Sequence, residues 1–191
     1  MKGYYTSVLI YTSLFVLLCC GESNRNSPPS AGSKQDETAA IEEPIFVDTD
    51  AGKTWHIFGI EIVGKIMSHQ TNGEYSVVVS TTPPDGGPPL HVHENEDELF
   101  YVLEGEYEFR CGEKKIRVSK GALVHLPRKL PHGFRNVGKE PGMLMNTIMP
   151  GGFEHFFEEV DQLPKDMPLE RKKVQSIASK YGLKFLPDTN C

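Results

Sequence analysis

The chain has 191 residues, enough for one ordinary domain with a core of its own, and its composition is that of a soluble globular protein rather than a fibrous or disordered one. The formal net charge is −6, and Lys and Arg are scattered apart from the pair 114–115 and the run 171–173. Nucleic-acid binding needs a concentrated basic face, so we expect no nucleic-acid partner.

Residues 1–20 predict an export signal. Lys2 precedes an apolar stretch from Val8 to Leu18 that is too short to span a membrane. The stretch ends in "LLCCG", which resembles a bacterial lipobox. That resemblance implies cleavage before Cys20, lipidation of Cys20, and an exported protein anchored to a bacterial membrane on its periplasmic or cell-surface side. The alternative is an ordinary secretory signal with incidental cysteines.

Residues 21–43 predict a disordered linker. They are rich in Ser, Asn, Pro and Glu and almost free of large apolar residues, so they cannot bury enough surface to fold. Such a tether would let an anchored domain stand off the bilayer. Beyond Cys20, only Cys111 and Cys191 follow, too few for a disulfide scaffold, and we expect Cys111 to be a small buried apolar side chain.

Residues 44–150 predict an all-β domain. Short alternating runs such as "EYSVVVSTT", "ELFYVL" and "EYEFRC" are separated by turn residues, a spacing that indicates an antiparallel sandwich or barrel. In residues 151–191 the apolar positions change to helical spacing, which predicts two C-terminal helices packed against the barrel, with Gly182 as a helix stop. The helical positions are Phe153, Phe156, Phe157 and Val160, followed by Val174, Ile177, Ala178 and Tyr181.

Two histidines stand one residue apart in "PPLHVHENEDELFYVLEGE", residues 88–106. On a strand, His91 and His93 point to the same face with Cα atoms about 6.5 to 7 Å apart. Two imidazoles at that separation can converge on one cation at about 2.0 to 2.2 Å. Glu98, at the start of the next apolar strand, could add an oxygen ligand. Taken alone, the histidine pair fits surface or satisfied core histidines equally well.

The same stretch resembles the first motif of the cupin family, G(x)5HxH(x)3,4E(x)6G. His91, His93, Glu98 and Gly105 fit its spacing, whereas Asp85 stands where the leading glycine belongs.

A second stretch resembles the other cupin motif, G(x)5PxG(x)2H(x)3N. Gly121, Pro127, His132 and Asn136 fit it, and Lys129 stands in place of the middle glycine. Both departures fall in predicted turns, so we expect them to change loop geometry without removing a ligand.

The resemblance implies a small antiparallel β-barrel of the cupin, or jelly-roll, type with one divalent transition metal. The implied ligands are His91, His93, Glu98 and His132. Iron, manganese, nickel, cobalt, copper and zinc all occur in such sites, and a set of three imidazoles and one carboxylate suits any of them while leaving positions open.

The stretches "PPLHVHENEDELFYVLEGEYEF" and "PGGFEHFFEEV" are similar to single-domain bacterial cupins of the quercetin 2,3-dioxygenase type. This similarity implies a metal-dependent dioxygenase for a small aromatic, flavonol-like substrate, with Glu98 as both ligand and acid/base group. The alternative is a non-catalytic cupin that binds a small ligand or metal at the cell surface. A sugar epimerase or isomerase fits less well, because those relatives use a metal-free histidine base. A homodimer paired through barrel edges is the oligomer that the family implies.

Other candidate residues have plainer interpretations. His125 is expected in the core or pocket wall, and His56, His69 and His155 outside the site. The remaining expectations are a solvated turn at Glu94, Glu96 and Asp97, a pocket wall or core at Phe100, Val102, Tyr107 and Phe109, and core filling by Met143, Met145 and Met149.

Overall fold

The computed structural model describes residues 43–164 and 170–187. The predicted signal peptide, the linker before Glu43, Cys20 and Cys191 lie outside these residues, so the expectations about them stay predictions. Within the described ranges, no helix has the length and apolar character needed to cross a membrane.

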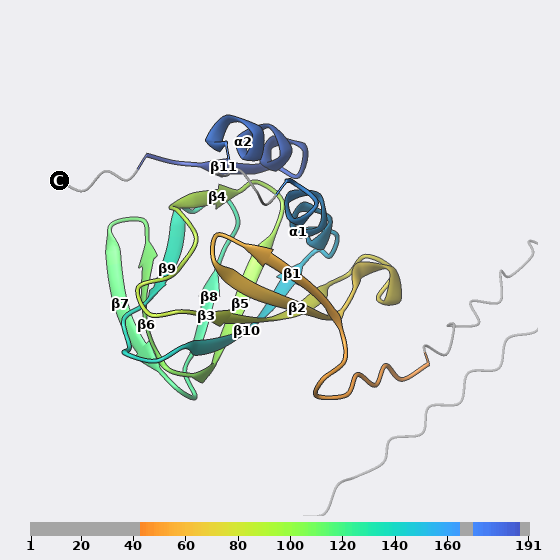
Figure 1. Cartoon of the computed structure of the whole chain (residues 1–191), viewed down its shortest axis with the longest axis horizontal. Helices are drawn as coiled ribbons and strands as arrows, with labels where there is room; N and C mark the ends of the chain where they lie inside the picture. The colour runs from red at the N-terminus through yellow and green to blue at the C-terminus, as the bar shows by residue number, and fades with distance from the viewer. Residues whose placement is uncertain (1–42, 165–169, 188–191) are drawn as a thin grey trace, which may run out of the picture. The chain divides into compact units, whose positions relative to one another are not determined.

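The described residues contain eleven strands in two antiparallel sheets (Figure 1). In spatial order, the first sheet consists of β1 (Lys53–Ile57), β2 (Ile60–Ile66), β3 (Ser76–Thr82), β10 (Gly142–Met149), β5 (Asp97–Glu104) and β8 (Leu123–Leu126). The second consists of β11 (Leu183–Phe185), β4 (His91–His93), β9 (His132–Asn136), β6 (Glu106–Cys111) and β7 (Lys114–Ser119). The predicted all-β jelly-roll architecture is confirmed. The strands do not hydrogen-bond around a closed barrel, however. They form two separate sheets, so the predicted closed barrel is wrong in this detail.

Alternation along the strands builds the core. In β3 and β10 every second side chain is buried, so one face of each strand packs inward. In β6, Tyr107 and Phe109 are fully buried while Glu106 is exposed. Cys111, at the end of β6, is a free and only half-buried thiol rather than the buried side chain expected, because the strand has reached the edge of the core there.

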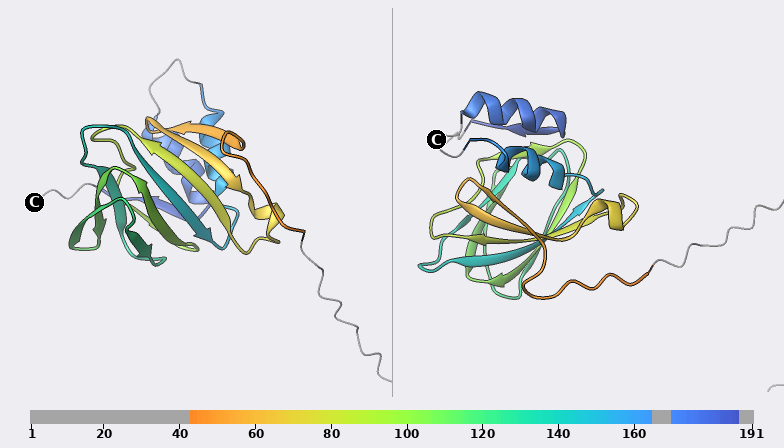
Figure 2. Two further views of the ribbon diagram at one scale, coloured as in Figure 1. Left: turned by 90° about the horizontal axis from the view of Figure 1, so that it is seen from below. Right: turned by 45° about the vertical axis from the view of Figure 1, so that its right-hand side comes forward.

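The C-terminal segment forms both expected helices, α1 (Glu154–Asp161) and α2 (Arg171–Lys180). Figure 2 shows them with β11 over one end of the sheets. The Glu154 carboxylate is buried and accepts hydrogen bonds from the backbone N–H groups of Gly152 (2.9 Å) and Ser68 (2.7 Å), the latter in the 3-10 helix η1 (Ser68–Gln70). This contact fixes the start of α1 against the domain.

Gly182 ends the turn after α2 with a φ of +72°, a conformation that glycine adopts without steric cost. The chain then forms β11, which the sequence did not predict because three residues carry too little pattern. Leu183 pairs with His93 and Phe185 with His91, so β11 lies along the strand that carries both histidines.

The two positions that depart from the cupin motifs both have left-handed backbone. Asp85 has a φ of +61° and Lys129 a φ of +66°, the region in which glycine is favoured. Both lie in turns, as expected. The Lys129 N–H donates to the carbonyl of His93 at 2.7 Å, so this turn holds the histidine strand although its glycine is replaced.

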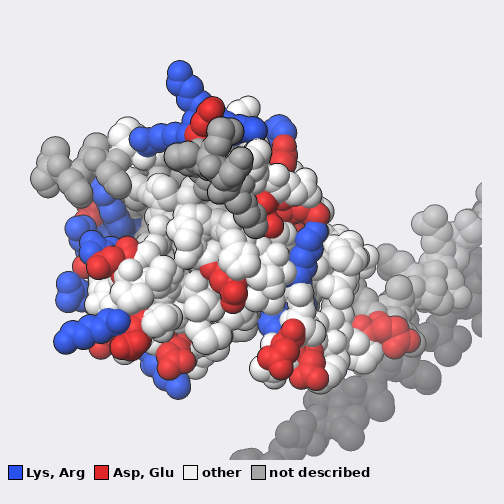
Figure 3. All heavy atoms as spheres, in the orientation of Figure 1, with Lys and Arg blue, Asp and Glu red and all other residues white. Residues whose placement is uncertain are grey.

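Charges of both signs lie close together on the face shown in Figure 3, and the middle of that face is largely uncharged. Among the described residues, Arg128 pairs with Asp97 at 2.9 Å, and Lys184 pairs with Glu94 at 2.8 Å. Exposed pairs of this kind contribute little stability but neutralise charge locally.

Candidate metal centre

His91 and His93 lie on β4, between β9 and β11, and point inward between the two sheets. Their side chains are almost fully buried, whereas Val92 between them is only partly buried, which is the period of two expected for a strand. The imidazole ring centroids are 5.1 Å apart.

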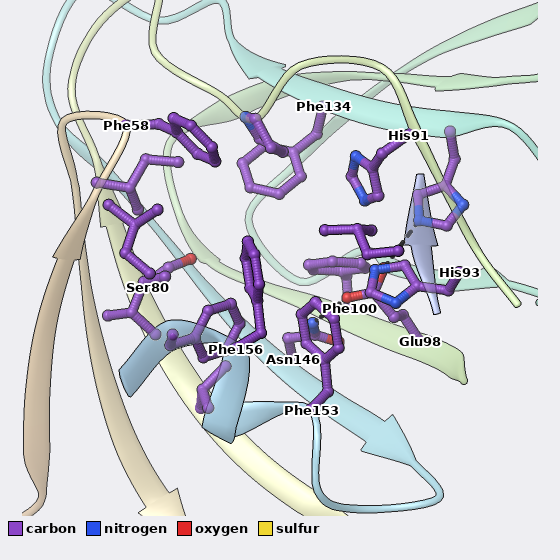
Figure 4. Close-up of a pocket in the computed structure, with 18 of the residues that line it drawn as sticks. Phe58, Ser80, His91, His93, Glu98, Phe100, Phe134, Asn146, Phe153 and Phe156 are labelled. Atoms are coloured by element: carbon purple, nitrogen blue, oxygen red, sulfur yellow. Dashed lines mark hydrogen bonds and ion pairs between the residues drawn. The ribbon is translucent and has the colours of Figure 1, made fainter. Parts of the chain in front are cut away.

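The other two predicted ligands reach the same point from different strands. His132 on β9 is directly opposite His91, and their ring centroids are 4.5 Å apart. Glu98 comes from β5 in the facing sheet (Figure 4). All four residues are buried, and one ligand atom from each lies within 4.8 Å of the others. Because metal bonds to nitrogen and oxygen are about 2.0 to 2.2 Å, ligand atoms on opposite sides of an ion are about 4.2 Å apart. The cluster has the size of such a shell.

The histidine rings are oriented by bonds on their outer nitrogens. Nδ1 of His91 lies 2.7 Å from the carbonyl of Pro89, and Nδ1 of His132 lies 2.8 Å from the carbonyl of Leu130. Nδ1 of His93 lies 3.2 Å from Oε2 of Glu96. A neutral imidazole that donates from Nδ1 presents Nε2 as an electron-pair donor, the form that binds a metal.

The Glu98 carboxylate needs positive charge beside it. Its Oε2 lies 2.9 Å from Nε2 of His132 and 3.6 Å from Nε2 of His93, although the Nδ1 of each ring already faces another oxygen. A neutral imidazole has one N–H and cannot donate at both nitrogens. Either an imidazolium or a cation shared by the nitrogens and Oε2 resolves this conflict, so the donor set fits a metal ion.

Burial and mutual attraction determine which members of the cluster are charged. Burial, together with the neighbouring His132 and His93, lowers the pKa of His91 to about 3. Burial favours the neutral forms of His93 and Glu98, yet their mutual attraction outweighs it. The pKa of His93 is raised with help from Glu96, and the pKa of Glu98 is held well below its usual range with help from His132. The site therefore keeps Glu98 ionised and His91 neutral, whereas the raised pKa of His93 means that this imidazole must lose a proton when a metal binds.

Glu96 is a functional candidate that sequence reasoning missed. It was expected in a solvated turn with Glu94 and Asp97, but the structure buries it to 7% exposure with its carboxylate on His93. Asp97 and Glu94 do face outward, where they pair with Arg128 and Lys184. These three acidic residues stand in one short turn, and the sequence does not indicate which of them is buried.

We predict that Glu96→Ala weakens metal binding. The loss should be about 10- to 100-fold, the usual effect of removing the carboxylate that orients a ligating histidine. Titration of the metal-free protein with Co²⁺ measures it, and Glu94→Ala, which removes a carboxylate that bonds Lys184 at the surface, is the control. Equal Co²⁺ affinity in Glu96→Ala and wild type would show that His93 is oriented without Glu96.

The cluster lies in a cavity with about 690 Å³ of space between its atoms, its opening included. Phenylalanines dominate the walls. Phe58 comes from the turn between β1 and β2, Phe100 and Phe134 come from the sheets, and Phe153, Phe156, Phe157 and Phe185 come from the C-terminal segment. Besides the four candidate ligands, the polar lining residues are Ser80 and Asn146, and no lysine or arginine is among the described residues that line it. Helix α1, expected only to pack on the barrel, and the strand β11 thus form part of the cavity wall.

Several other sequence expectations change. His125 is exposed on β8, so it is neither core nor pocket wall, because the register of β8 turns it outward. His56, His69 and His155 are exposed, outside the site as expected. Of the four residues expected in a pocket wall or core, Phe100 lines the cavity and the others are core. The three methionines of β10 are half-buried on the outer face rather than core filling, since the inner face belongs to the alternate positions.

Asn146 is a second residue of the site that was not predicted from the sequence. It shares the inner face of β10 with Leu144 and Ile148, and its Nδ2 donates to Oε1 of Glu98 at 2.6 Å. A polar residue in the apolar register of "GMLMNTIM" was the signal that could have revealed it.

Comparison with known proteins agrees with the two motifs. The profile of the cupin domain family matches residues 78–148, which hold all four candidate ligands. The fold is a cupin fold. Solved structures with this fold include a predicted oxalate decarboxylase from Thermotoga maritima (TM-score 0.52, 19% identity, 55% of this chain and 98% of that chain). KdgF from Halomonas sp. is similar to the same extent (TM-score 0.52, 19% identity, 58% and 98%). At this identity they establish the fold alone.

Two curated relatives are more similar in sequence to this chain. Quercetin 2,3-dioxygenase from Bacillus subtilis is 31% identical over 87 residues, which are 46% of this chain and 26% of that protein. An uncharacterized protein from Methanocaldococcus jannaschii is 32% identical over 75 residues, 39% of this chain and 60% of that protein. The chain thus spans about a quarter of the first relative and three fifths of the second.

Proposed function

We propose that this cupin is a metal-dependent dioxygenase that acts on a small aromatic substrate. One observation carries the proposal: three imidazoles and a carboxylate converge at one point of a cavity that is otherwise walled mainly by aromatic and aliphatic side chains. A cavity with this lining favours a flat, uncharged molecule that presents oxygen to the cluster and packs its ring against phenylalanine.

The lining also argues against other cupin chemistries. Sugar phosphates and dicarboxylates need basic or numerous polar groups, and Ser80 and Asn146 are the polar residues that line the described cavity beyond the ligand set. The negative charges of a sugar phosphate or of a small dicarboxylate substrate would lie unpaired in this apolar cavity.

The chain's own residues supply the remaining steps. His91, His93, Glu98 and His132 would hold the metal, which when bound supplies Lewis acidity and a route for electrons between substrate and dioxygen. Glu98 is held ionised and lines the cavity, so it is placed to accept the proton of a substrate hydroxyl. The phenylalanine walls orient the ring and exclude water from the reacting atoms.

Similarity to the B. subtilis quercetin 2,3-dioxygenase supports this proposal at the level of the domain. Fold alone does not determine chemistry on a scaffold as widely used as this one. The cavity lining and the ligand set are the independent arguments.

The test is oxygen consumption. We expect wild-type protein reconstituted with iron, manganese, cobalt, nickel or copper to consume oxygen when offered flavonols or catechols, measured with an oxygen electrode. Metal-free protein is the control. A protein that binds metal and an aromatic ligand without oxygen uptake for any combination would be a binding module, the alternative that the aromatic cavity also suits.

A further inference from the structure

The cavity extends across the six-stranded sheet well beyond the candidate metal centre. Its lining includes Glu98 on β5 and Ile62 on β2, and β10 and β3 lie between these two strands. Neighbouring strands are about 4.8 Å apart, so the lining spans roughly 14 Å across the sheet. One aromatic ring bound at the metal position therefore cannot fill the cavity.

Ser80 lies in the part of the lining that is distant from the metal centre. The strand register pairs Ile148 of β10 with both Glu98 and Ser76, so Ser80 is two strands and four residues from Glu98. With about 4.8 Å between strands and about 3.3 Å per residue, the Cα atoms of Ser80 and Glu98 are roughly 16 Å apart along the sheet. Figure 4 shows Ser80 on the opposite side of the cavity from the histidines.

The Ser80 hydroxyl is accessible from the cavity. Ser76, Ser80 and Thr82 all point inward from β3, but Ser76 and Thr82 are 0% exposed and their side-chain oxygens are enclosed by protein. Ser80 lines the cavity, is 7% exposed, and its oxygen is not enclosed in this way. Other residues occupy the outward positions of β3, so the exposed part of the Ser80 side chain belongs to the cavity, and Figure 4 shows its oxygen turned toward the cavity interior.

This hydroxyl has no hydrogen-bond partner among the described residues. The neighbouring lining residues on β2 and β3, Ile60, Ile62 and Val78, are apolar. A hydroxyl can both donate and accept a hydrogen bond, and an unpaired one in apolar surroundings costs free energy. A ligand that reaches Ser80 therefore binds best when it presents a polar group there.

We infer that Ser80 binds a second polar group of the substrate, a hydroxyl or a carbonyl, at the end remote from the metal-binding oxygen. The inference rests on the proposed function and narrows its substrate class to elongated aromatic molecules with at least two rings. Phe100, Phe134 and Phe156 line the same cavity and supply aromatic surface for those rings. A single-ring phenol is too short to contact both Ser80 and the metal position.

The test compares two probes that differ only at the remote end. The first, p-phenylphenol, has one hydroxyl for the metal, and the second, p,p′-biphenol, carries another hydroxyl at the opposite end of the same two-ring skeleton. Co²⁺-loaded wild type and Ser80→Ala are titrated with each probe without oxygen, so that calorimetry measures binding alone. We expect the ratio of p,p′-biphenol affinity to p-phenylphenol affinity to be about 10-fold lower in Ser80→Ala, because the remote hydroxyl loses its partner.

Thr82→Val is the matched control. It removes a hydroxyl from the same face of β3, but Thr82 is fully buried and is not among the described residues that line the cavity. Its affinity ratio should equal that of wild type. Ser80→Cys nearly keeps the shape of the side chain, but a thiol is a weak hydrogen-bonding group, so its ratio should also fall. This second variant separates a lost hydrogen bond from lost volume.

The outcomes separate the inference from the proposed function. An unchanged ratio in both Ser80 variants, or an equal fall in Thr82→Val, overturns the direct contact with Ser80 and leaves the proposed function standing. Binding of catechol to wild type without binding of either two-ring probe would show that the cavity accepts single rings only, which overturns the inference but not the proposed function. Failure of all three phenols to bind wild type removes the proposed aromatic substrate and this inference with it.

Discussion

The variant His132→Ala should lose metal binding by more than the 10- to 100-fold typical for removal of an orienting partner, because it removes a ligand itself. His132 lies on β9 opposite His91 of β4. Its Nε2 lies 2.9 Å from Oε2 of Glu98, closer than Nε2 of His93 does. His91→Ala and His93→Ala should have comparable effects, since each leaves the shell one ligand short. Metal content after purification and Co²⁺ titration measure the loss, and circular dichroism checks that the fold is kept.

His125→Ala is the appropriate control for this series. His125 is exposed on β8, outside the cavity, so its removal should leave metal content unchanged. Full metal occupancy in His91→Ala and His93→Ala would refute the assigned ligand set.

The second large effect is expected at Glu98. Glu98→Gln keeps the size of the side chain but cannot accept a proton from a substrate hydroxyl, so turnover should fall by about 10²- to 10⁴-fold while some metal binding remains. The measurement is oxygen uptake per bound metal, with each protein reconstituted in the same way. Dividing by bound metal separates lost proton transfer from lost ligation.

Glu94→Gln provides the control for Glu98→Gln. Glu94 is four residues away in the chain, but its carboxylate bonds Lys184 at the surface. Oxygen uptake per metal should match wild type. Equal uptake by wild type and Glu98→Gln would exclude Glu98 from the mechanism, whereas a binding module would show no uptake in either protein.

Local periodicity explains why much of the molecule was predictable. Strands alternate with a period of two, and this placed His91 and His93 on one inward face before any partner strand was known. The change to helical spacing after Gly152 located both helices, because apolar residues three and four apart share one face of a helix. Each inference needs only neighbours along the chain.

Contacts between distant segments were decided by tertiary structure alone. Glu94 and Glu96 stand in the same acidic turn, and packing sends one to Lys184 on the surface and the other to His93 in the interior. The strand β11 exists because β4 has an edge free to pair with it, which no property of three residues can indicate.

By itself the sequence determined the all-β architecture, the two helices and the residues able to meet as metal ligands. Only tertiary structure decided that the two sheets stay separate, that phenylalanines from α1 and β11 wall the cavity, and that Asn146 bonds Glu98. The physical reason is that periodicity states which face of an element is buried, whereas the residues it is buried against depend on how elements far apart in the chain pack together.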